Sequence, residues 1–469
     1  MLTKLSIPPI SKPVLLFVCI CLAAVACKPS GKLAREEGVS YSPKTISQLA
    51  TKLDTSSVFS SNFTGFALYD PAADRMIYAQ NEHRYFTPAS NTKLFTFYAG
   101  LKLLPNLMPA LRYVSRGDSL IFWGTGDPSF LHPEIGDSKV YSFLRNRKDK
   151  LYFSDANFDD KRLGPGWAWD DYQYAYQAEK SPLPLYGNMV HFEMDSHSRR
   201  ENGPKKGALS VEPAIFEAYI DTIASKRIGR FILRRDISGN RFRYNPEKKR
   251  NAFSLNKPYH YTPQLITDML SDTLAKEVDY ADVPLPDTTN VLYSIPTDTA
   301  YKHMLGPSDN FIAEQLLLVM ADQLGGNLNA EAVIDTMENH YLDFMTDEPQ
   351  WADGSGLSRY NLFTPASMVQ LLAAIDKEFH SDQQLFELLP AGGERGTIEH
   401  WYAARDGGPP YIFAKTGTLS NNHNLSGYLI TQSGQKLIFS FMNNHYISST
   451  ATIKKEMEKV LWYIHTDFE

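Results

Sequence analysis

Three short groups of residues in this sequence could do chemistry together: Ser90-Asn-Thr-Lys93, Ser308-Asp-Asn310 and Lys415-Thr-Gly417-Thr418. A serine hydroxyl is a weak nucleophile and needs a neighbouring base to take its proton. Lysine can be that base when burial and nearby positive charge lower its pKa. Residues three apart share one face of a helix, so Lys93 can reach the Ser90 hydroxyl. Lys415 could supply the positive charge and also attract an anionic end of a substrate.

Each group is weak evidence when it is taken alone. The spacing Ser-x-x-Lys recurs at Ser254 and Ser433, and Ser-x-Asn recurs at Ser60, Ser238, Ser254 and Ser420. By itself, Ser90 could be a helix N-cap, Ser308 a helix start, and Lys415 a strand end that turns at a glycine. All three groups in this chain order are typical of penicillin-binding proteins and class A β-lactamases. We therefore expect a serine acyl-transfer enzyme with Ser90 as the nucleophile.

The elements that must position these residues follow from the pattern of apolar residues. Two apolar runs around an Asp-Pro turn predict a β-hairpin over residues 63–79. Apolar residues at three and four spacing predict helices after Ser90 and over 310–324, 330–344, 364–378 and 451–465. A second hairpin is predicted over 411–442, turning near Gly434. From about 105 to 290, short strand-like runs alternate with turn residues, which indicates a β-rich insertion.

Composition excludes several classes of function. The chain has 469 residues, of which 43% are hydrophobic and 21% charged, enough for two or three globular domains. A net charge of −6 gives no reason to expect nucleic acid as a partner. All cysteines (Cys19, Cys21 and Cys27) lie near the start, so no disulfide framework is expected downstream. The histidines show no ligand spacing, and we expect neither a metal nor another cofactor.

The opening segment is typical of export. Lys4 and Lys12 precede an apolar run over residues 14–26, which is too short to span a membrane. Small residues before Cys27 resemble a bacterial lipoprotein cleavage site. We expect a lipoprotein signal peptide over 1–27, lipidation at Cys27, a linker over 28–41, and an exported, periplasmic protein anchored to a bacterial membrane. The alternative is a plain secretory signal that ends in a chance cysteine.

Further motifs extend the match over about residues 45–460. They are Pro88–Lys93, Gly126–Pro128, Gly166–Asp171, Ala178–Ser181, Asn188, Ser308–Glu314, Asp353–Arg359, Gly396-Thr397 and Ala414–Leu419. With these motifs the chain resembles the class C low-molecular-mass penicillin-binding proteins, which are D-alanyl-D-alanine carboxypeptidases and endopeptidases. The resemblance implies an α+β fold with a transpeptidase domain like that of serine β-lactamases, an antiparallel sheet flanked by helices. We expect that domain over 42–105 and 291–469, with 106–290 inserted as one or two nested domains.

The resemblance also implies a role for each matched residue. The catalytic set would be Ser90, Lys93, Ser308, Asn310 and Lys415, and the substrate-binding set Thr416, Gly417 and Thr418. Ser90 would be acylated, Lys93 would take its proton, and Ser308 would relay a proton to the leaving D-alanine. Asn310 would hold the substrate amide, and the Lys415 segment would bind the terminal carboxylate. The backbone N–H groups of Ser90 and Thr418 would form the oxyanion hole.

Three further residues have two interpretations each. Arg359 meets the free end of the peptide side chain or makes an ion pair that supports the fold. Asp155 and Asp159 serve that same substrate end or are structural turn residues.

At residues 420–424, where the family usually has small residues, the sequence reads Ser-Asn-Asn-His-Asn. We expect a polar loop there, with His423 solvated, that could narrow substrate choice or slow acylation.

The expected function is therefore hydrolysis of D-alanyl-D-alanine ends of peptidoglycan stem peptides through an acyl-enzyme on Ser90, with covalent inhibition by β-lactams. Whether the chain is a carboxypeptidase or an endopeptidase stays open. One alternative is a β-lactamase-like hydrolase, which would need a dedicated water-activating carboxylate that the sequence does not reveal. Another is a slow or inactive penicillin-binding sensor or scaffold, which would have no need of the nucleophile and its lysine.

Overall fold

The computed structural model describes residues 41–136, 139–194, 199–200, 203–204, 209–223, 231–245 and 252–468. The expected signal peptide over 1–27, the lipidation at Cys27 and nearly all of the linker over 28–41 lie outside these residues. Within the described part of the chain, no helix has the length and apolar character needed to cross a membrane.

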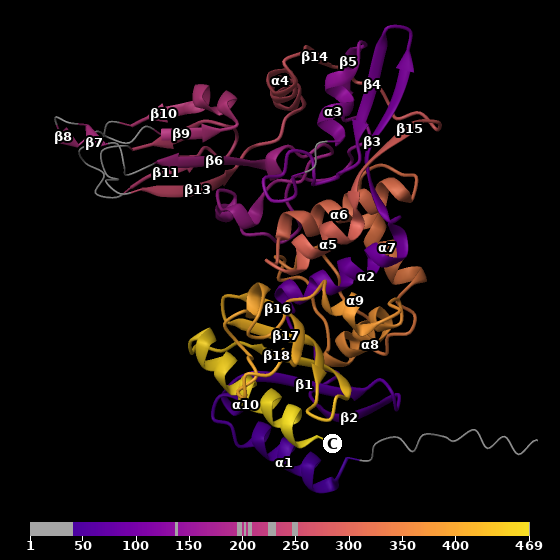
Figure 1. Cartoon of the computed structure of the whole chain (residues 1–469), viewed down its shortest axis with the longest axis vertical. Coiled ribbons are helices and arrows are strands. Elements are labelled where there is room, and N and C mark those ends of the chain that lie inside the picture. The colour runs from indigo at the N-terminus through magenta and orange to yellow at the C-terminus, as the bar shows by residue number, and fades with distance from the viewer. Residues whose placement is uncertain are drawn as a thin grey trace, which may run out of the picture. The chain divides into compact units, whose positions relative to one another are not determined.

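The two ends of the chain build one antiparallel sheet together. Its strand order is β16 (Ile412–Leu419), β17 (Asn422–Ile430), β18 (Lys436–Asn444), β1 (Phe63–Asp70) and β2 (Arg75–Gln80) (Figure 1). The pair β1–β2 confirms the first predicted hairpin. The second prediction was wrong in part, because residues 411–442 form three paired strands instead of one hairpin. The extra turn lies at Ser420-Asn421, where Asn421 has a φ of +69°.

Helices cover both faces of this sheet (Figure 1). On one face, α1 (Pro43–Asp54) and α10 (Thr450–Asp467) pack against Phe66, Leu68 and Phe439. On the other face, α2 (Lys93–Leu103) and α8 (Pro365–Asp376) share a core with Ala67 and Ile438. Successive strand residues point to opposite faces, so each strand supplies both cores.

A helical layer follows the sheet and carries the second group of site residues. It contains α5 (Thr297–Leu305), α6 (Asn310–Gln323), α7 (Ala330–His340) and the short α9 (Asp382–Phe386). Every residue of α6 from Phe311 to Asp322 is buried, which explains why this helix is apolar nearly all round. Its N-cap is Asp309, whose carboxylate accepts the backbone N–H of Ile312 at 2.8 Å.

The inserted region is rich in strands, as its sequence pattern predicts. A mixed sheet has the order β14 (Val278–Tyr280), β5 (Lys150–Ser154), β4 (Ser119–Gly124), β3 (Leu107–Arg116) and β15 (Asn290–Pro296). A second sheet has the order β13 (Phe253–Pro258), β6 (Met189–Met194) and β9 (Leu209–Glu212), and a third the order β10 (Ile220–Thr222), β12 (Phe242–Tyr244) and β11 (Leu233–Arg235). The remaining elements are the pair β7 (Arg199–Arg200) and β8 (Gly203–Pro204), α3 (Lys139–Asn146) and α4 (Pro263–Leu274). Because β15 pairs with β3, the residues just after 290 extend the sheet of the inserted region. The domain boundaries expected at 105/106 and 290/291 stay a prediction.

Candidate active site

Ser90 lies in a single 3-10 turn, Ala89–Thr92, that leads directly into α2. Two glycines from other segments pack closely against the backbone of this turn. A Cβ on Gly417 would lie 2.1 Å from the carbonyl oxygen of Pro88, and one on Gly356 would lie 1.9 Å from that of Ala89. Gly356 also has a φ of +81°, a conformation that other residues rarely adopt. Close backbone contact therefore fixes the turn against the edge strand β16.

Lys93 is fully buried one turn after Ser90. Its Nζ donates to Ser90 Oγ at 3.0 Å, to Asn310 Oδ1 at 2.6 Å and to the backbone oxygen of Ser355 at 2.7 Å. Burial lowers the Lys93 pKa from 10.5 to about 8, although nearby carboxylates act in the opposite direction. A substantial fraction of this amine is therefore neutral near physiological pH and can accept the Ser90 proton.

Ser308, in the loop between α5 and α6, and Asn310, the first residue of α6, reach the same point. Ser308 has a φ of +68°, and its Oγ accepts a hydrogen bond from Lys415 Nζ at 2.7 Å. The Asn310 side chain uses Oδ1 for Lys93 and donates one Nδ2 hydrogen to the backbone oxygen of Tyr176 at 2.9 Å. An amide NH₂ has two hydrogens, so a second one can bind a substrate carbonyl.

The strand β16 supplies the third side of the site. Lys415 is fully buried, and both burial and the charge of Lys93 lower its pKa well below the ordinary value. Thr416 Oγ1 donates to Thr397 Oγ1 at 2.8 Å. Thr418 Oγ1 is hydrogen-bonded to His423 Nδ1 at 2.8 Å. The edge strand thus presents one lysine, which contacts Ser308, and two hydroxyls.

The structure does not bring Arg359, Asp155 or Asp159 into this cluster. Arg359 donates to the backbone oxygen of Ser420 at 3.0 Å, at the turn after β16. Asp155 accepts two tyrosine hydroxyls, those of Tyr261 at 2.7 Å and Tyr280 at 2.9 Å. The backbone of Asp159 is bonded outside the cluster: its N–H donates to the Leu328 carbonyl, and its carbonyl accepts from Asn329 Nδ2.

The expectation of a solvated loop histidine at His423 was wrong. His423 lies in β17, is fully buried, and has a pKa lowered by burial to about 3, so its ring is neutral. It belongs to a row of buried polar residues: Asn424 Nδ2 donates to the Thr87 backbone oxygen at 2.9 Å. Internal hydrogen bonds replace water here, which lets polar residues occupy strand interiors.

Sequence reasoning did not single out Glu314 as a member of the site. This buried carboxylate accepts the backbone N–H of Ser355 at 2.8 Å, and the carbonyl of Ser355 accepts Lys93 Nζ. Burial, with the charge of Asp353 adding to it, raises the Glu314 pKa to about 7. The sequence did offer one signal for Glu314: it lies four residues after Asn310 and ends the family motif Ser308–Glu314. No group of three or more metal-ligating residues occurs in the described part of the chain.

Four features define the class of penicillin-binding proteins and serine β-lactamases. They are a serine at the start of a buried helix, a lysine one turn further on, a Ser-x-Asn segment, and a lysine on the edge strand of an antiparallel sheet covered by helices. Residues 46–463 match the model of the D-Ala-D-Ala carboxypeptidase 3 (S13) family. The chain belongs to this family. The fold class, the enzyme class and the reaction class that the motifs predict are thereby confirmed.

Individual relatives agree with the family assignment. The chain is 24% identical over 463 residues to the D-alanyl-D-alanine carboxypeptidase DacB of Haemophilus influenzae, covering 90% of this chain and 93% of the relative. It is 25% identical over 425 residues to a D-alanyl-D-alanine carboxypeptidase of Actinomadura sp. strain R39, covering 81% and 77%. The crystal structure of penicillin binding protein 4 from Haemophilus influenzae superposes with a TM-score of 0.67 at 22% identity, covering 89% and 97% of the two chains.

Proposed function

We propose that this enzyme cleaves the terminal D-alanyl-D-alanine bond of peptidoglycan stem peptides through an acyl-enzyme on Ser90. The observation that carries the proposal is the buried Lys93 amine, 3.0 Å from Ser90 Oγ and held in place by Asn310 and Ser355. A fully buried lysine that contacts a serine hydroxyl has little structural use, because burial of its charge is costly.

The acylation step follows from this geometry. Neutral Lys93 takes the Ser90 proton while Oγ bonds to the substrate carbonyl carbon, and the backbone N–H groups of Ser90 and Thr418 receive the oxyanion. Removal of one such donor typically costs about 3–4 kcal/mol. When the C–N bond breaks, Ser308 gives its proton to the leaving nitrogen and receives one from Lys415, the partner of its hydroxyl. The proton that Lys93 took from Ser90 in turn restores Lys415. Water then attacks the ester, Lys93 takes the water proton and passes it to Ser90 Oγ, and the free acid leaves with every group in its starting form.

Substrate binding is assigned to the rest of β16. Lys415 in its protonated form would attract the terminal carboxylate, and the hydroxyls of Thr416 and Thr418 would turn from Thr397 and His423 to donate to its oxygens. Gly417 lets the strand lie against the Ser90 turn, so the carboxylate and the scissile carbonyl are held a fixed distance apart. We assign Asp155 to the fold, since its carboxylate accepts the hydroxyls of Tyr261 and Tyr280. We also assign Asp159 to the fold, through its backbone bonds to Leu328 and Asn329, and Arg359 to the support of the Ser420 turn.

Export and lipidation are also proposed. The basic, then apolar, opening segment and the small residues before Cys27 support a lipid-anchored periplasmic enzyme, close to its peptidoglycan substrate. Growth of the producing cells with an alkyne-tagged fatty acid tests this proposal. The full chain should take up the tag, and Cys27→Ala should not; equal tagging of both chains would contradict lipidation at Cys27.

Release of D-alanine from a stem pentapeptide tests the proposed reaction. Ser90→Ala should abolish release. Ser254→Ala is the matched control, because Ser254 has the same spacing to a lysine but lies exposed on β13. Full release by Ser90→Ala, or its loss in Ser254→Ala alone, would contradict the assignment of the nucleophile.

A further inference from the structure

The Thr418 hydroxyl contacts a buried histidine on the neighbouring strand. Thr418 lies near the end of the edge strand β16 and is exposed. The strand register pairs it with His423 of β17. The His423 side chain is fully buried, and its Nδ1 lies 2.8 Å from Thr418 Oγ1. The hydroxyl therefore has solvent on one side and an imidazole ring on the other.

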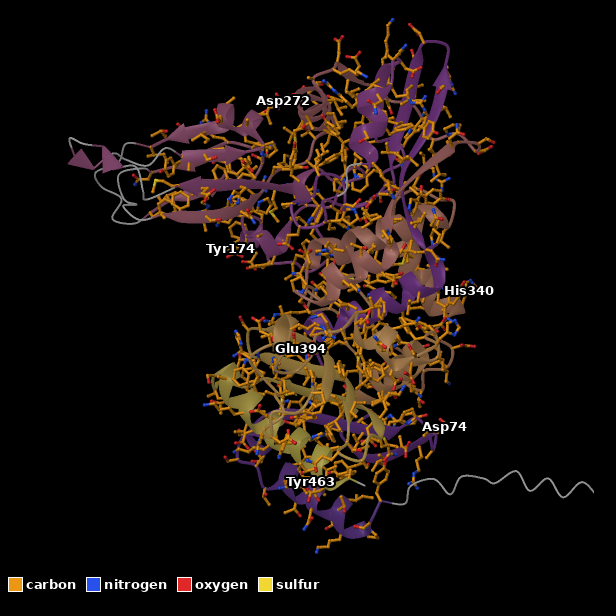
Figure 2. The ribbon with its side chains drawn as sticks, in the orientation of Figure 1. Asp74, Tyr174, Asp272, His340, Glu394 and Tyr463 are labelled. Carbon is orange, nitrogen blue, oxygen red and sulfur yellow. The ribbon has the colours of Figure 1, made fainter. Side chains whose placement is uncertain are left out.

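The surroundings of the His423 ring determine how many hydrogens it carries. Alternate residues of a strand share a face, so His423 points the same way as Leu425 and Leu429, into the core beneath α10. Tyr463, labelled in Figure 2, lies on this helix, which contacts β17. Among the described residues, no hydrogen-bond partner meets the buried Nε2 atom. Burial and the positive charge of Lys454 lower the pKa of the ring to about 3, so the ring is neutral and carries a single N–H.

A neutral ring can meet the Thr418 hydroxyl in two ways. With the ring hydrogen on Nε2, Nδ1 accepts the hydroxyl hydrogen, and the Nε2–H has no acceptor among the described residues. With the ring hydrogen on Nδ1, the ring donates to Thr418 Oγ1, and the hydroxyl hydrogen is free to turn outward. Only the second arrangement leaves Thr418 a hydrogen for another acceptor.

A bound carboxylate distinguishes these two arrangements. A carboxylate only accepts hydrogen bonds, so Thr418 must donate to it. With the ring hydrogen on Nε2, Nδ1 and Oγ1 would then face each other at 2.8 Å with lone pairs and no hydrogen between them. With the ring hydrogen on Nδ1, that bond is kept, and only the Nε2 lone pair is unmatched. Because unmatched buried polar groups are costly, a carboxylate at Thr418 selects the second arrangement.

We propose that His423 is a positioning residue whose Nδ1–H donates to Thr418 Oγ1 and so turns the hydroxyl hydrogen toward the terminal carboxylate of the substrate. This inference rests on the proposed function, which places that carboxylate at Thr418. A hydroxyl held in this way is a fixed donor, and a hydrogen bond to an ionised acceptor is stronger than one to a neutral acceptor. His423 therefore contributes to the preference for a peptide with a free carboxylate and acts through Thr418 without touching the substrate.

The first experiment compares two peptides that differ only in the terminal carboxylate. One is the stem pentapeptide, and in the other ethylamine replaces the terminal D-alanine. His423→Leu should lower kcat/KM for the pentapeptide about threefold to tenfold, mainly through KM, as expected for one lost hydrogen bond. Release of ethylamine, measured by mass spectrometry, should change less than about twofold.

Two further variants separate the hydrogen bond from the packing of β17. His423→Asn places an amide N–H near the position of Nδ1–H, so it should restore most of the activity on the pentapeptide. Leu429→Ala is the matched control, because Leu429 is buried on the same strand face but pairs with Ile412, at the far end of β16 from Thr418. It should leave the ratio of the two kcat/KM values unchanged.

The second experiment locates the ring hydrogen directly in the wild-type chain. Nitrogen NMR of protein labelled at histidine should show His423 with its hydrogen on Nδ1, and the signal is assigned by its loss in His423→Asn. A hydrogen on Nε2 would overturn the proposal whether or not the leucine variant folds.

The remaining outcomes each bear on one claim. An equal loss on both peptides in His423→Leu, or a loss in His423→Asn as large as that in His423→Leu, would overturn the positioning role. So would unchanged cleavage of the pentapeptide by His423→Leu. A wild-type chain that neither releases D-alanine nor takes up penicillin would instead overturn the proposed function itself.

Discussion

Raising the pH from 6 to 9 should accelerate acylation of Ser90, because Lys93 must be neutral to take its proton. Burial lowers the Lys93 pKa from 10.5 to about 8, and the charges of Asp309, Asp353 and Glu314 only partly oppose it. At pH 7 about 9% of such an amine is neutral, against roughly 0.03% at the ordinary pKa, a gain of about 300-fold that corresponds to about 3 kcal/mol. Burial of one side chain therefore supplies most of the neutral amine that can take the Ser90 proton at this pH.

The assay is the pseudo-first-order rate constant for labelling by a fluorescent penicillin, at fixed ionic strength, with Ser90→Ala as the background. The rate constant should rise about tenfold between pH 6 and 7, reach half its maximum near pH 8 and level off above pH 9. Glu314→Gln removes a charge that raises the Lys93 pKa, so its midpoint should lie at lower pH. A midpoint near that of an ordinary lysine, or a flat profile between pH 6 and 8, would refute Lys93 as the base.

Three further predictions concern residues around the nucleophile. The Glu314 pKa is raised to about 7, so the folded state loses stability as the pH rises from 4.5 to 7. At pH 8 Glu314→Gln should therefore have a higher melting temperature than the wild type and a free energy of unfolding larger by at most about 3 kcal/mol. At pH 5 the two melting temperatures should be the same. Gly356→Ala should displace the Ala89 turn, lower the free energy of unfolding in urea by about 1–3 kcal/mol and slow penicillin labelling. His423→Leu keeps a buried side chain but removes the hydrogen bond to Thr418, and KM for the pentapeptide should rise about threefold to tenfold while the labelling pH profile keeps its shape.

Each of these predictions has a contrary result. A melting-temperature gain of equal size at pH 5 and pH 8 would show that the charge of Glu314 is not its cause. Gly434 has a similar φ of +86° but open space around its Cβ, so Gly434→Ala separates backbone strain from the clash at Gly356. If both alanine variants slow labelling equally, contact with the Ser90 turn is not the reason. A new titration step in His423→Leu would contradict a neutral, structural histidine.

Much of the site could be predicted from the sequence because its residues lie at element boundaries. Ser90 and Lys93 open a helix with a clear apolar face, and Ser308 and Asn310 precede another. Lys415 lies in an apolar run before a glycine. Boundaries of this kind leave a local signature, so motif order and helix starts together place these residues in one cluster.

The sequence was misleading where buried residues are polar. Residues 420–424 look like a loop, yet His423 and Asn424 lie within β17, where His423 Nδ1 is hydrogen-bonded to Thr418 on the paired strand and Asn424 Nδ2 donates to the distant Thr87 backbone. Hydrophobic alternation cannot detect a strand whose inward side chains are held by hydrogen bonds. Glu314 was passed over for the same reason, since a carboxylate in a helix is usually solvated. The return of the chain through β15 depends on pairing with β3, almost two hundred residues earlier, which no local pattern records.

The most direct test of the central claim is the mass of the protein after brief exposure to benzylpenicillin, followed by peptide mapping of the adduct. The account predicts a mass increase of one penicillin on the native chain, located on the peptide that ends at Lys93 and contains Ser90, and no increase on Ser90→Ala. An adduct on any other peptide, or a native chain that gains no mass, would contradict Ser90 as the nucleophile.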